Sequence, residues 1–229
     1  MPAQNNSPET LTQPTGGVTV PAFEYGFYDQ CLRESYEKFG GILDLPIVDS
    51  PYSEARRWYA SGNVLDIGAG RAHALERVLD GALKDGRYYS LDTDPRGQFD
   101  FAKVQEIPDD LSFSLIVANQ VFEHLTIDTS LEVMAHATAH MAPGASIVAT
   151  VPNVAHPNRF MSNITHVTYW GHHSFYMLFK AAGLEVKNMA RYSKVHPRGL
   201  IERLFARYAG RIYRMDWCDS LLVRAVKHA

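Results

Sequence analysis

The sequence predicts an α/β fold in which helices cover both faces of a mostly parallel sheet. From residue 63 onward, short apolar runs alternate with segments whose apolar residues recur at helical spacing. Continuous apolar strands separated by helices are typical of parallel sheets that are buried on both faces. In such sheets ligands bind beyond the carboxyl ends of the strands, so the residues that follow each strand are the first candidates for function.

Each element can be assigned from its own pattern. The expected strands are the apolar runs at residues 64–67, 88–91, 115–118, 146–151, 184–190 and 220–226. The expected helices between them are residues 72–83, 129–141 and 173–182, the last of which is ended by Gly183. Arg203, Arg207 and Arg211 recur every four residues and predict one more helix, with these arginines on the face opposite its apolar residues. That basic face is either simply solvated or a patch for an anionic substrate or partner.

The residues before this alternation differ in composition. Residues 1–21 are rich in Pro, Gly, Thr and Asn and predict a flexible tail. Residues 22–62 predict two helices, 23–39 and 53–61, that form a lid over the ligand site. In the first helix Phe27, Cys31, Tyr36 and Phe39 are expected near one face, and in the second Ser53 is the expected N-cap. Residues 63–229 then form the α/β domain.

Composition limits the partners and the compartment. The chain has 229 residues, a formal net charge of −3 and two cysteines. A general nucleic-acid binder is usually strongly basic, so nucleic acid is not an expected partner. Two cysteines far apart in the sequence predict reduced thiols and no disulfide framework. Neither a signal peptide nor a membrane-spanning segment is visible. We therefore expect a cytoplasmic protein without a membrane partner, and the sequence is compatible with a homodimer.

Two features in succession point to a ligand site. The strand 64–67 leads directly into Gly68-Ala69-Gly70, where glycine lets the backbone approach a ligand closely, although such a turn also occurs without one. Asp92 ends the next strand, where a carboxylate can accept hydrogen bonds from both ribose hydroxyls. The alternative for Asp92 is a local turn before Pro95.

Four segments in order resemble the motif set of the class I S-adenosylmethionine-dependent methyltransferases. They are VLDIGAG, YYSLDTDP, FSLIVANQVFEHL and MAPGASIVATVPN. The resemblance covers roughly residues 60–190 and is strongest to small-molecule and ubiquinone-type O-methyltransferases. It implies a Rossmann-like sheet of seven strands whose last strand is antiparallel, and S-adenosylmethionine as the cofactor. It also implies that the cofactor is bound by Asp66, Gly68, Ala69, Gly70, Asp92, Thr93, Asn119 and Gln120.

The sequence departs from this family at one position that matters for the adenine. An acidic residue often binds the adenine amino group five positions before the proline of Glu106-Ile107-Pro108, but here that residue is Lys103. Asp100 or backbone groups are the alternatives. This departure keeps open a non-catalytic, cofactor-binding module as an alternative to an enzyme.

Glu123, His124 and His166 are the expected catalytic residues. Some relatives, including small-RNA 3′-end 2′-O-methyltransferases, bind a divalent metal with a Glu-x-x-Glu-His run and a later histidine. Here Gln120 replaces the first glutamate, and hard cations prefer carboxylate oxygens, so we expect no metal. A neutral imidazole of His124 or His166 can instead accept the proton of a hydroxyl nucleophile, while a purely structural role for either histidine is the alternative.

The function predicted from the sequence is methyl transfer to a small-molecule acceptor, at a hydroxyl oxygen. Methyl transfer from a sulfonium needs mostly proximity and alignment, which explains why no nucleophile of the protein itself is evident. An RNA 2′-O-methyltransferase-like enzyme is the remaining alternative, favoured by the histidines and the arginine helix and opposed by the net charge.

Overall fold

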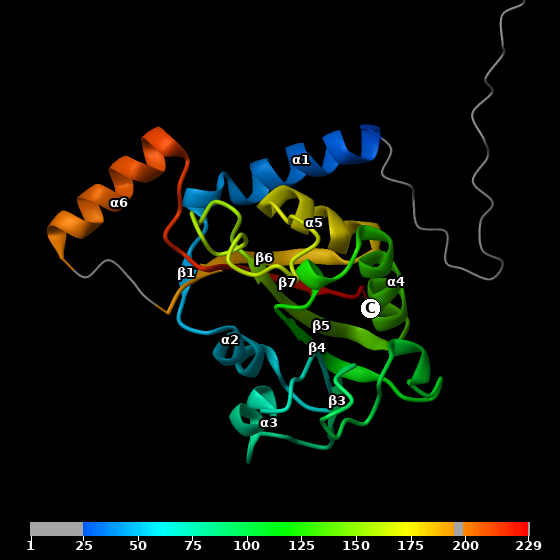
Figure 1. Ribbon diagram of the computed structural model, residues 1–229. Helices are drawn as coiled ribbons and strands as arrows, with labels where there is room; N and C mark the ends of the chain where they lie inside the picture. The colour runs from blue at the N-terminus through cyan, green and yellow to red at the C-terminus, as the bar shows by residue number, and fades with distance from the viewer. Residues whose placement is uncertain (1–24, 195–198, 229) are drawn as a thin grey trace, which may run out of the picture.

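The computed structural model describes residues 25–194 and 199–228, which form a seven-stranded sheet between two layers of helices (Figure 1). The predicted tail, residues 1–21, lies outside the described residues. The strand order is β1-β6-β7-β5-β4-β2-β3. The strands are β1 (Ile47–Val48), β2 (Val64–Ile67), β3 (Tyr88–Leu91), β4 (Phe113–Asn119), β5 (Met141–Pro152), β6 (Glu185–Tyr192) and β7 (Ser220–Val226).

The expected Rossmann-like sheet is confirmed, including its antiparallel last strand. Strands β2 to β5 are mutually parallel, and β7 lies between β5 and β6 and is antiparallel to both. The seventh strand was not predicted, because it is the two-residue β1, where Ile47 pairs in parallel with Arg191 of β6. Two residues are too few for a periodic pattern, so this strand depends on its pairing with β6.

Helices cover both faces of the sheet. They are α1 (Tyr25–Phe39), α2 (Pro51–Trp58), α3 (Ala74–Leu79), α4 (Ile127–Ala139), α5 (His172–Ala181) and α6 (Leu200–Tyr213), with short 3₁₀ helices η1 (Ile42–Asp44), η2 (Val104–Glu106) and η3 (Phe122–His124). Alternate residues of β2 enter different layers of the core: Leu65 packs with α4 and α5, whereas Val64 packs with α2 and α3. Helix α1 packs over α5 (Figure 1).

Aromatic side chains fill the layer between α5 and the sheet. Phe122, Phe175 and Phe179 are fully buried, and the indole Nε1 of Trp170 donates to the carbonyl of Phe122 at 2.9 Å. Burial of a side chain of this size stabilises the fold by about 1.5–3 kcal/mol. The residues around Glu123 therefore rest on a rigid part of the core.

The structure of α1, α2 and α3 differs in detail from the prediction. Helix α2 is capped by Ser50, whose side chain accepts from the amide of Tyr52, and not by Ser53, because Pro51 already starts the helix. Tyr36 of α1 is 62% exposed and does not share the buried face of Cys31. Helix α3 covers only Ala74–Leu79 of the predicted 72–83, since the chain leaves the glycine turn through further turn residues before it becomes helical.

Helix α6 stands apart from the rest of the molecule, connected between β6 and β7 (Figure 1). Its C-terminal half contacts the body, where Ala209 and Gly210 are buried, and Phe205 lies near Trp217 of the segment that returns to the sheet. Successive helical residues are about 100° apart, so Arg203, Arg207 and Arg211 lie beside the apolar stripe of the helix. The prediction that these arginines lie opposite the apolar face is therefore wrong. Among the described residues, no helix is long and apolar enough to cross a membrane.

Candidate functional site

The predicted site residues meet at the carboxyl edge of the four parallel strands. The register aligns Ile67 of β2 with Leu91 of β3 and with Ala118 of β4, and Asn119 of β4 with Thr150 of β5. The segments that follow these strands therefore leave the sheet at one level. This is the edge where parallel α/β sheets bind ligands.

The glycine turn after β2 is fixed by the end of β3. The amides of Gly68 and Ala69 both donate to the carbonyl of Leu91, at 2.8 and 3.2 Å. Gly68 has a φ of +71°, and a Cβ at this position would lie 2.5 Å from Cγ2 of Val121. Gly70 has a φ of +59°, but a Cβ there would meet no atom within 4 Å. The turn is thus packed on one side at Gly68 and faces open space at Gly70.

Asp92 connects this turn to its own loop. Its Oδ2 accepts from the amide of Gly70 at 2.9 Å, and its Oδ1 accepts from the amide of Asp94 at 2.9 Å. The Asp94 contact is the local turn considered as the alternative for this residue. A carboxylate oxygen has two acceptor positions, so each oxygen of the half-buried Asp92 retains one for a ligand hydroxyl. The neighbouring Thr93 is exposed beside it.

Asp66 is a buried acid beneath the turn. It is 3% exposed, and the hydroxyl of Tyr88 donates to its Oδ2 at 2.9 Å. Burial raises the pKa of Asp66 to about 7; the Tyr88 hydrogen bond opposes this rise and the charge of Asp92 adds to it. A cationic ligand group nearby would favour the ionised form of this carboxyl.

Asn119 and Gln120 form a polar network at the end of β4. The Asn119 amide donates to the hydroxyl of Tyr52 at 3.0 Å and accepts from the hydroxyl of Thr150 at 2.6 Å. Gln120, with a φ of +58°, donates to the Thr150 hydroxyl at 3.2 Å and accepts from the Arg159 guanidinium at 3.2 Å. Both predicted residues are therefore held by partners on α2, on β5 and in the loop after β5.

Glu123, His124 and His166 come together as predicted. Glu123 is 1% exposed, and neither of its carboxylate oxygens has a hydrogen-bond partner among the described residues. Burial raises the pKa of Glu123 to about 7. The rings of His124 and His166 are 5.0 Å apart, and Nε2 of His124 lies 4.0 Å from Oε1 of Glu123.

Backbone carbonyls set the tautomer of both histidines. Nδ1 of His124 lies 3.1 Å from the carbonyl oxygen of Thr165, and Nδ1 of His166 lies 2.8 Å from that of Phe160. The hydroxyl of Thr165 also lies 3.0 Å from Nδ1 of His124, but it donates its one proton to Oδ1 of Asn163 at 2.9 Å. The hydroxyl and the carbonyls are therefore all acceptors toward Nδ1, so each neutral ring carries its proton on Nδ1 and keeps the Nε2 lone pair available. Both imidazoles are thereby prepared to accept a proton or to bind a metal at Nε2.

Among the described residues, these three also form a group that could hold a metal ion. Their ligand atoms all lie within 4.8 Å of one another. Two features oppose a cation: Gln120 is neutral where a second carboxylate would be needed, and the positive charge of Arg159 already acts on Glu123. The expectation of no metal therefore stays a prediction.

The residues near the predicted adenine position have other partners. Asp100 accepts from both the amide and the hydroxyl of Ser90, at 2.9 and 3.0 Å, and pairs with the Arg87 guanidinium. Lys103 is exposed and precedes η2. Backbone groups are consequently better candidates than Asp100 for the adenine amino group. A hollow of about 550 Å³ lined by His73, Tyr88 and Asp100 lies nearby, but it does not include Gly68, Gly70 or Asp92.

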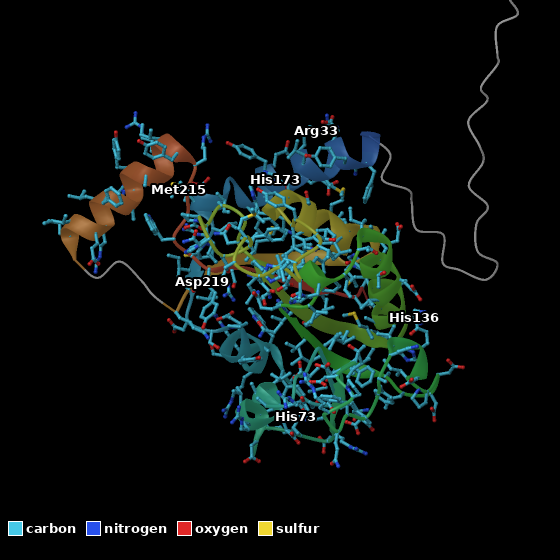
Figure 2. All side chains as sticks on the ribbon, viewed as in Figure 1. Arg33, His73, His136, His173, Met215 and Asp219 are labelled. Atoms are coloured by element: carbon cyan, nitrogen blue, oxygen red, sulfur yellow. The ribbon has the colours of Figure 1, made fainter. Side chains whose placement is uncertain are left out.

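Four other histidines lie away from this cluster. His173 contacts the hydroxyl of Ser35 under α1, and its neighbour His172 is half-buried, a partial desolvation that lowers the pKa of His172 to about 4. Figure 2 shows His173 near α1, His136 on α4 and His73 beside α3, at three separate places on the molecule. Their positions agree with the choice of His124 and His166 as candidates.

Sequence reasoning missed three residues that complete the site: Tyr52, Thr150 and Arg159. Thr150 could have been found, because it is a polar residue at the carboxyl end of an apolar parallel strand. Tyr52 and Arg159 belong to segments whose position relative to the strands is set by tertiary packing alone.

The family follows from a comparison of the sequence with family models. A model described as a methyltransferase domain matches residues 37–188, more than half of the chain. The chain belongs to this family, which confirms the resemblance carried by the four motifs. It is an S-adenosylmethionine-dependent methyltransferase of class I. No curated protein matches the sequence.

Solved structures share the same fold at low identity. A SAM-dependent methyltransferase from Archaeoglobus fulgidus is 18% identical with a TM-score of 0.59, and the match covers 86% of this chain and 99% of that one. The 1,6-didemethyltoxoflavin-N1-methyltransferase from Burkholderia thailandensis, solved with 1,6-didemethyltoxoflavin and S-adenosylhomocysteine, is 18% identical with a TM-score of 0.54, over 93% of this chain and 94% of that one. At these identities the likeness concerns the fold alone.

Proposed function

We propose that this methyltransferase transfers the methyl group of S-adenosylmethionine to a hydroxyl oxygen of a small-molecule acceptor. The observation that carries the proposal is the pair of imidazoles, His124 and His166, whose Nδ1 atoms are occupied by backbone carbonyls and whose Nε2 atoms are available. They lie on the loops that follow β4 and β5, at the ligand-binding edge of the sheet.

The cofactor residues fit their predicted roles. Gly70 faces open space, so a ligand can lie against the turn without meeting a side chain there. Asp92 retains acceptor capacity on both oxygens for the two ribose hydroxyls. Asp66 lies beneath the turn, where its carboxylate attracts the ammonium group of the amino-acid part of the cofactor, and that positive charge in turn favours the ionised form of Asp66.

A hydroxyl acceptor explains the histidines. When bound, S-adenosylmethionine supplies a methyl group on a sulfonium, which any aligned nucleophile can accept. An alcohol must lose its proton as it attacks, and Nε2 of His124 or His166 takes that proton as a general base. Glu123, buried 4.0 Å from Nε2 of His124, stabilises the resulting imidazolium when it is ionised.

Helix α2 contributes a wall of the acceptor site. The hydroxyl of Tyr52 accepts from Asn119 at the end of β4, which holds the N-terminal turn of α2 against the carboxyl edge of the sheet. The predicted lid therefore corresponds best to α2, since α1 packs over α5. The Burkholderia neighbour, named for a small-molecule acceptor, supports an acceptor of this size.

Methyl transfer from labelled S-adenosylmethionine to matched panels of small molecules tests this function. The panels contain phenols and alcohols in one set, and amines of similar size in the other. We expect labelled products from the hydroxyl set, with the methyl group located on oxygen by mass spectrometry. Labelling of added RNA alone, or of amines alone, would contradict the proposal, and no transfer to any acceptor would favour the non-catalytic alternative.

A further inference from the structure

The exposed side of α6 carries an apolar stripe that the described part of the chain leaves largely uncovered, although Phe205 at one edge of it lies near Trp217, with ring centroids 6.2 Å apart. Six side chains of this helix are each 53–82% exposed: Leu200, Ile201, Leu204, Phe205, Tyr208 and Ile212. At about 100° per residue they occupy an arc of roughly 140°. Large exposed apolar patches of this kind mark interaction sites on soluble proteins.

A row of arginines runs along one border of the stripe. Residues 199–215 contain four arginines and a single acid, Glu202, although the whole chain has a net charge of −3. Within the described residues Arg207, Arg211 and Arg214 make no ion pair. The positive charge of these arginines therefore lies on the surface next to the apolar stripe. Their charge is complementary to that of an anionic partner.

The helix is held so that this face points away from the body. Gly210 packs closely against Leu43, where an added Cβ would lie 3.0 Å from the leucine Cδ1. Below the helix, Arg191 pairs with Asp216 at 3.0 Å, and Asp216 also accepts from Asn153 at 2.7 Å. Figures 1 and 2 show α6 projecting outward, with Met215 and Asp219 on the segment that returns to the sheet. A flat partner can reach α6 without disturbing the strands.

We propose that α6 docks the protein on the surface of a bilayer that contains anionic lipids. An amphipathic helix with aromatic and aliphatic residues on one face and arginines beside them binds in the plane of a membrane interface. The arginines contact lipid phosphates while the stripe enters the boundary of the acyl chains. Nucleic acid offers no apolar counterpart to six such side chains. This mode is compatible with the absence of a spanning helix among the described residues, but it departs from the expectation that no membrane is a partner.

Flotation of the full chain with lipid vesicles tests the proposal and does not depend on methyl transfer. We expect binding to vesicles of mixed phosphatidylglycerol and phosphatidylcholine, and at least tenfold weaker binding to pure phosphatidylcholine. Leu204→Glu with Phe205→Glu should abolish binding, and Arg207→Gln with Arg211→Gln should weaken it about tenfold or more on the anionic vesicles.

Matched controls alter the same kinds of residue elsewhere. Tyr36→Glu changes an exposed aromatic residue of α1, and Arg33→Gln with Arg57→Gln removes two exposed charges; both should bind as the unaltered chain does. Circular dichroism and melting temperature establish that each variant is folded. Absence of binding to anionic vesicles, or binding that the α6 variants leave unchanged, would overturn the proposal. So would sedimentation showing a dimer that Leu204→Glu dissociates, because a second copy would then cover the stripe.

Discussion

The amide of Gly70 donates to Oδ2 of Asp92 at 2.9 Å, and this hydrogen bond joins the turn after β2 to the end of β3. At Gly70 the backbone faces open space, and Asp92 supplies the carboxylate beside it. The two predicted cofactor motifs are thus a single unit, because a change at Asp92 also removes a partner of the turn. Substitutions at these positions can therefore act through lost ligand contacts or through loss of the turn itself.

Replacement of Asp92 by Ala should weaken binding of S-adenosylhomocysteine roughly 30- to 150-fold. The variant loses two charge-assisted hydrogen bonds to the ribose, together worth roughly 2–3 kcal/mol. Isothermal titration calorimetry measures the dissociation constant. Asp94→Ala is the control, because that carboxylate pairs with Arg96 and Arg71 and should leave affinity nearly unchanged. Equal affinity of folded Asp92→Ala and the unaltered protein would mean that the ribose lies elsewhere.

The two glycines of the turn should respond differently to alanine. Gly68→Ala combines a positive φ with an overlap against Val121, and should lower the free energy of unfolding by about 2–5 kcal/mol. Gly70→Ala meets no protein atom and should cost only about 1–2 kcal/mol, but its methyl group enters the ligand space and should weaken cofactor binding ~10-fold or more. Urea unfolding and calorimetry on both variants check this. If the double variant Gly68→Ala/Val121→Ala recovers stability, the loss in Gly68→Ala comes from the overlap with Val121. Equal losses of stability and of affinity in Gly68→Ala and Gly70→Ala would refute the distinction between the two glycines.

The cofactor-free protein should lose stability as the pH rises from about 4 to about 7. Asp66 has its pKa raised from an ordinary 3.8 to about 7, so in this window the unfolded chain is ionised while the folded one holds the proton. The stabilisation is complete below the unfolded pKa and is lost as the pH passes through the folded one. For Asp66 alone the loss is on the order of 3–4 kcal/mol. Glu123, whose pKa is also about 7, contributes in the same direction.

Asp66→Asn isolates the share of Asp66 in this pH dependence. The amide cannot ionise, so the difference in unfolding free energy between pH 5 and pH 8 should shrink by a few kcal/mol, with the contribution of Glu123 remaining. Urea unfolding at the two pH values measures it. An unchanged pH dependence in the variant would show that Asp66 is ionised in the folded protein at pH 5.

Methyl transfer should survive treatment with EDTA. Glu123, His124 and His166 can meet at one ion, but Gln120 supplies no charge, and its carbonyl oxygen already accepts from Arg159. The rate of the chelated enzyme is compared with that of the untreated enzyme on the same acceptor. Loss of activity that manganese, magnesium or zinc restores would show that the three residues bind a required metal.

The strands and the glycine turn could be predicted because their signals are local. A run such as Leu115–Ala118 is apolar and short, and Gly68 follows a strand directly and has a positive φ, which glycine adopts without strain. The six longer strands and the position of Asp92 followed from such patterns. The cap of α2 was misplaced by three residues, because Ser50 and Ser53 are both plausible and Pro51 decides between them.

What could not be predicted depends on contacts between segments far apart in the chain. Strand β1 exists through its pairing with Arg191 and Tyr192 of β6. The available Nε2 of His124 depends on the carbonyl of Thr165, more than forty positions away, and the network of Asn119 depends on Tyr52. The sequence placed the histidines near the site, but only these contacts determine which ring nitrogen is protonated.

If the acceptor is a hydroxyl, removal of the general base should slow turnover roughly 10²- to 10⁴-fold and leave cofactor binding nearly intact. His124→Ala and His166→Ala are therefore compared by single-turnover methyl transfer and by calorimetry with S-adenosylhomocysteine. His136→Ala, on α4 and away from the cluster, is the matched control and should retain full turnover (Figure 2). A loss confined to one variant identifies the base, and Glu123→Gln should then lower turnover by a smaller factor, since it only stabilises the imidazolium. If both histidine variants keep near-full turnover while folded, neither is the base. An amine would then be the better acceptor, because a neutral amine attacks the methyl group without prior loss of a proton.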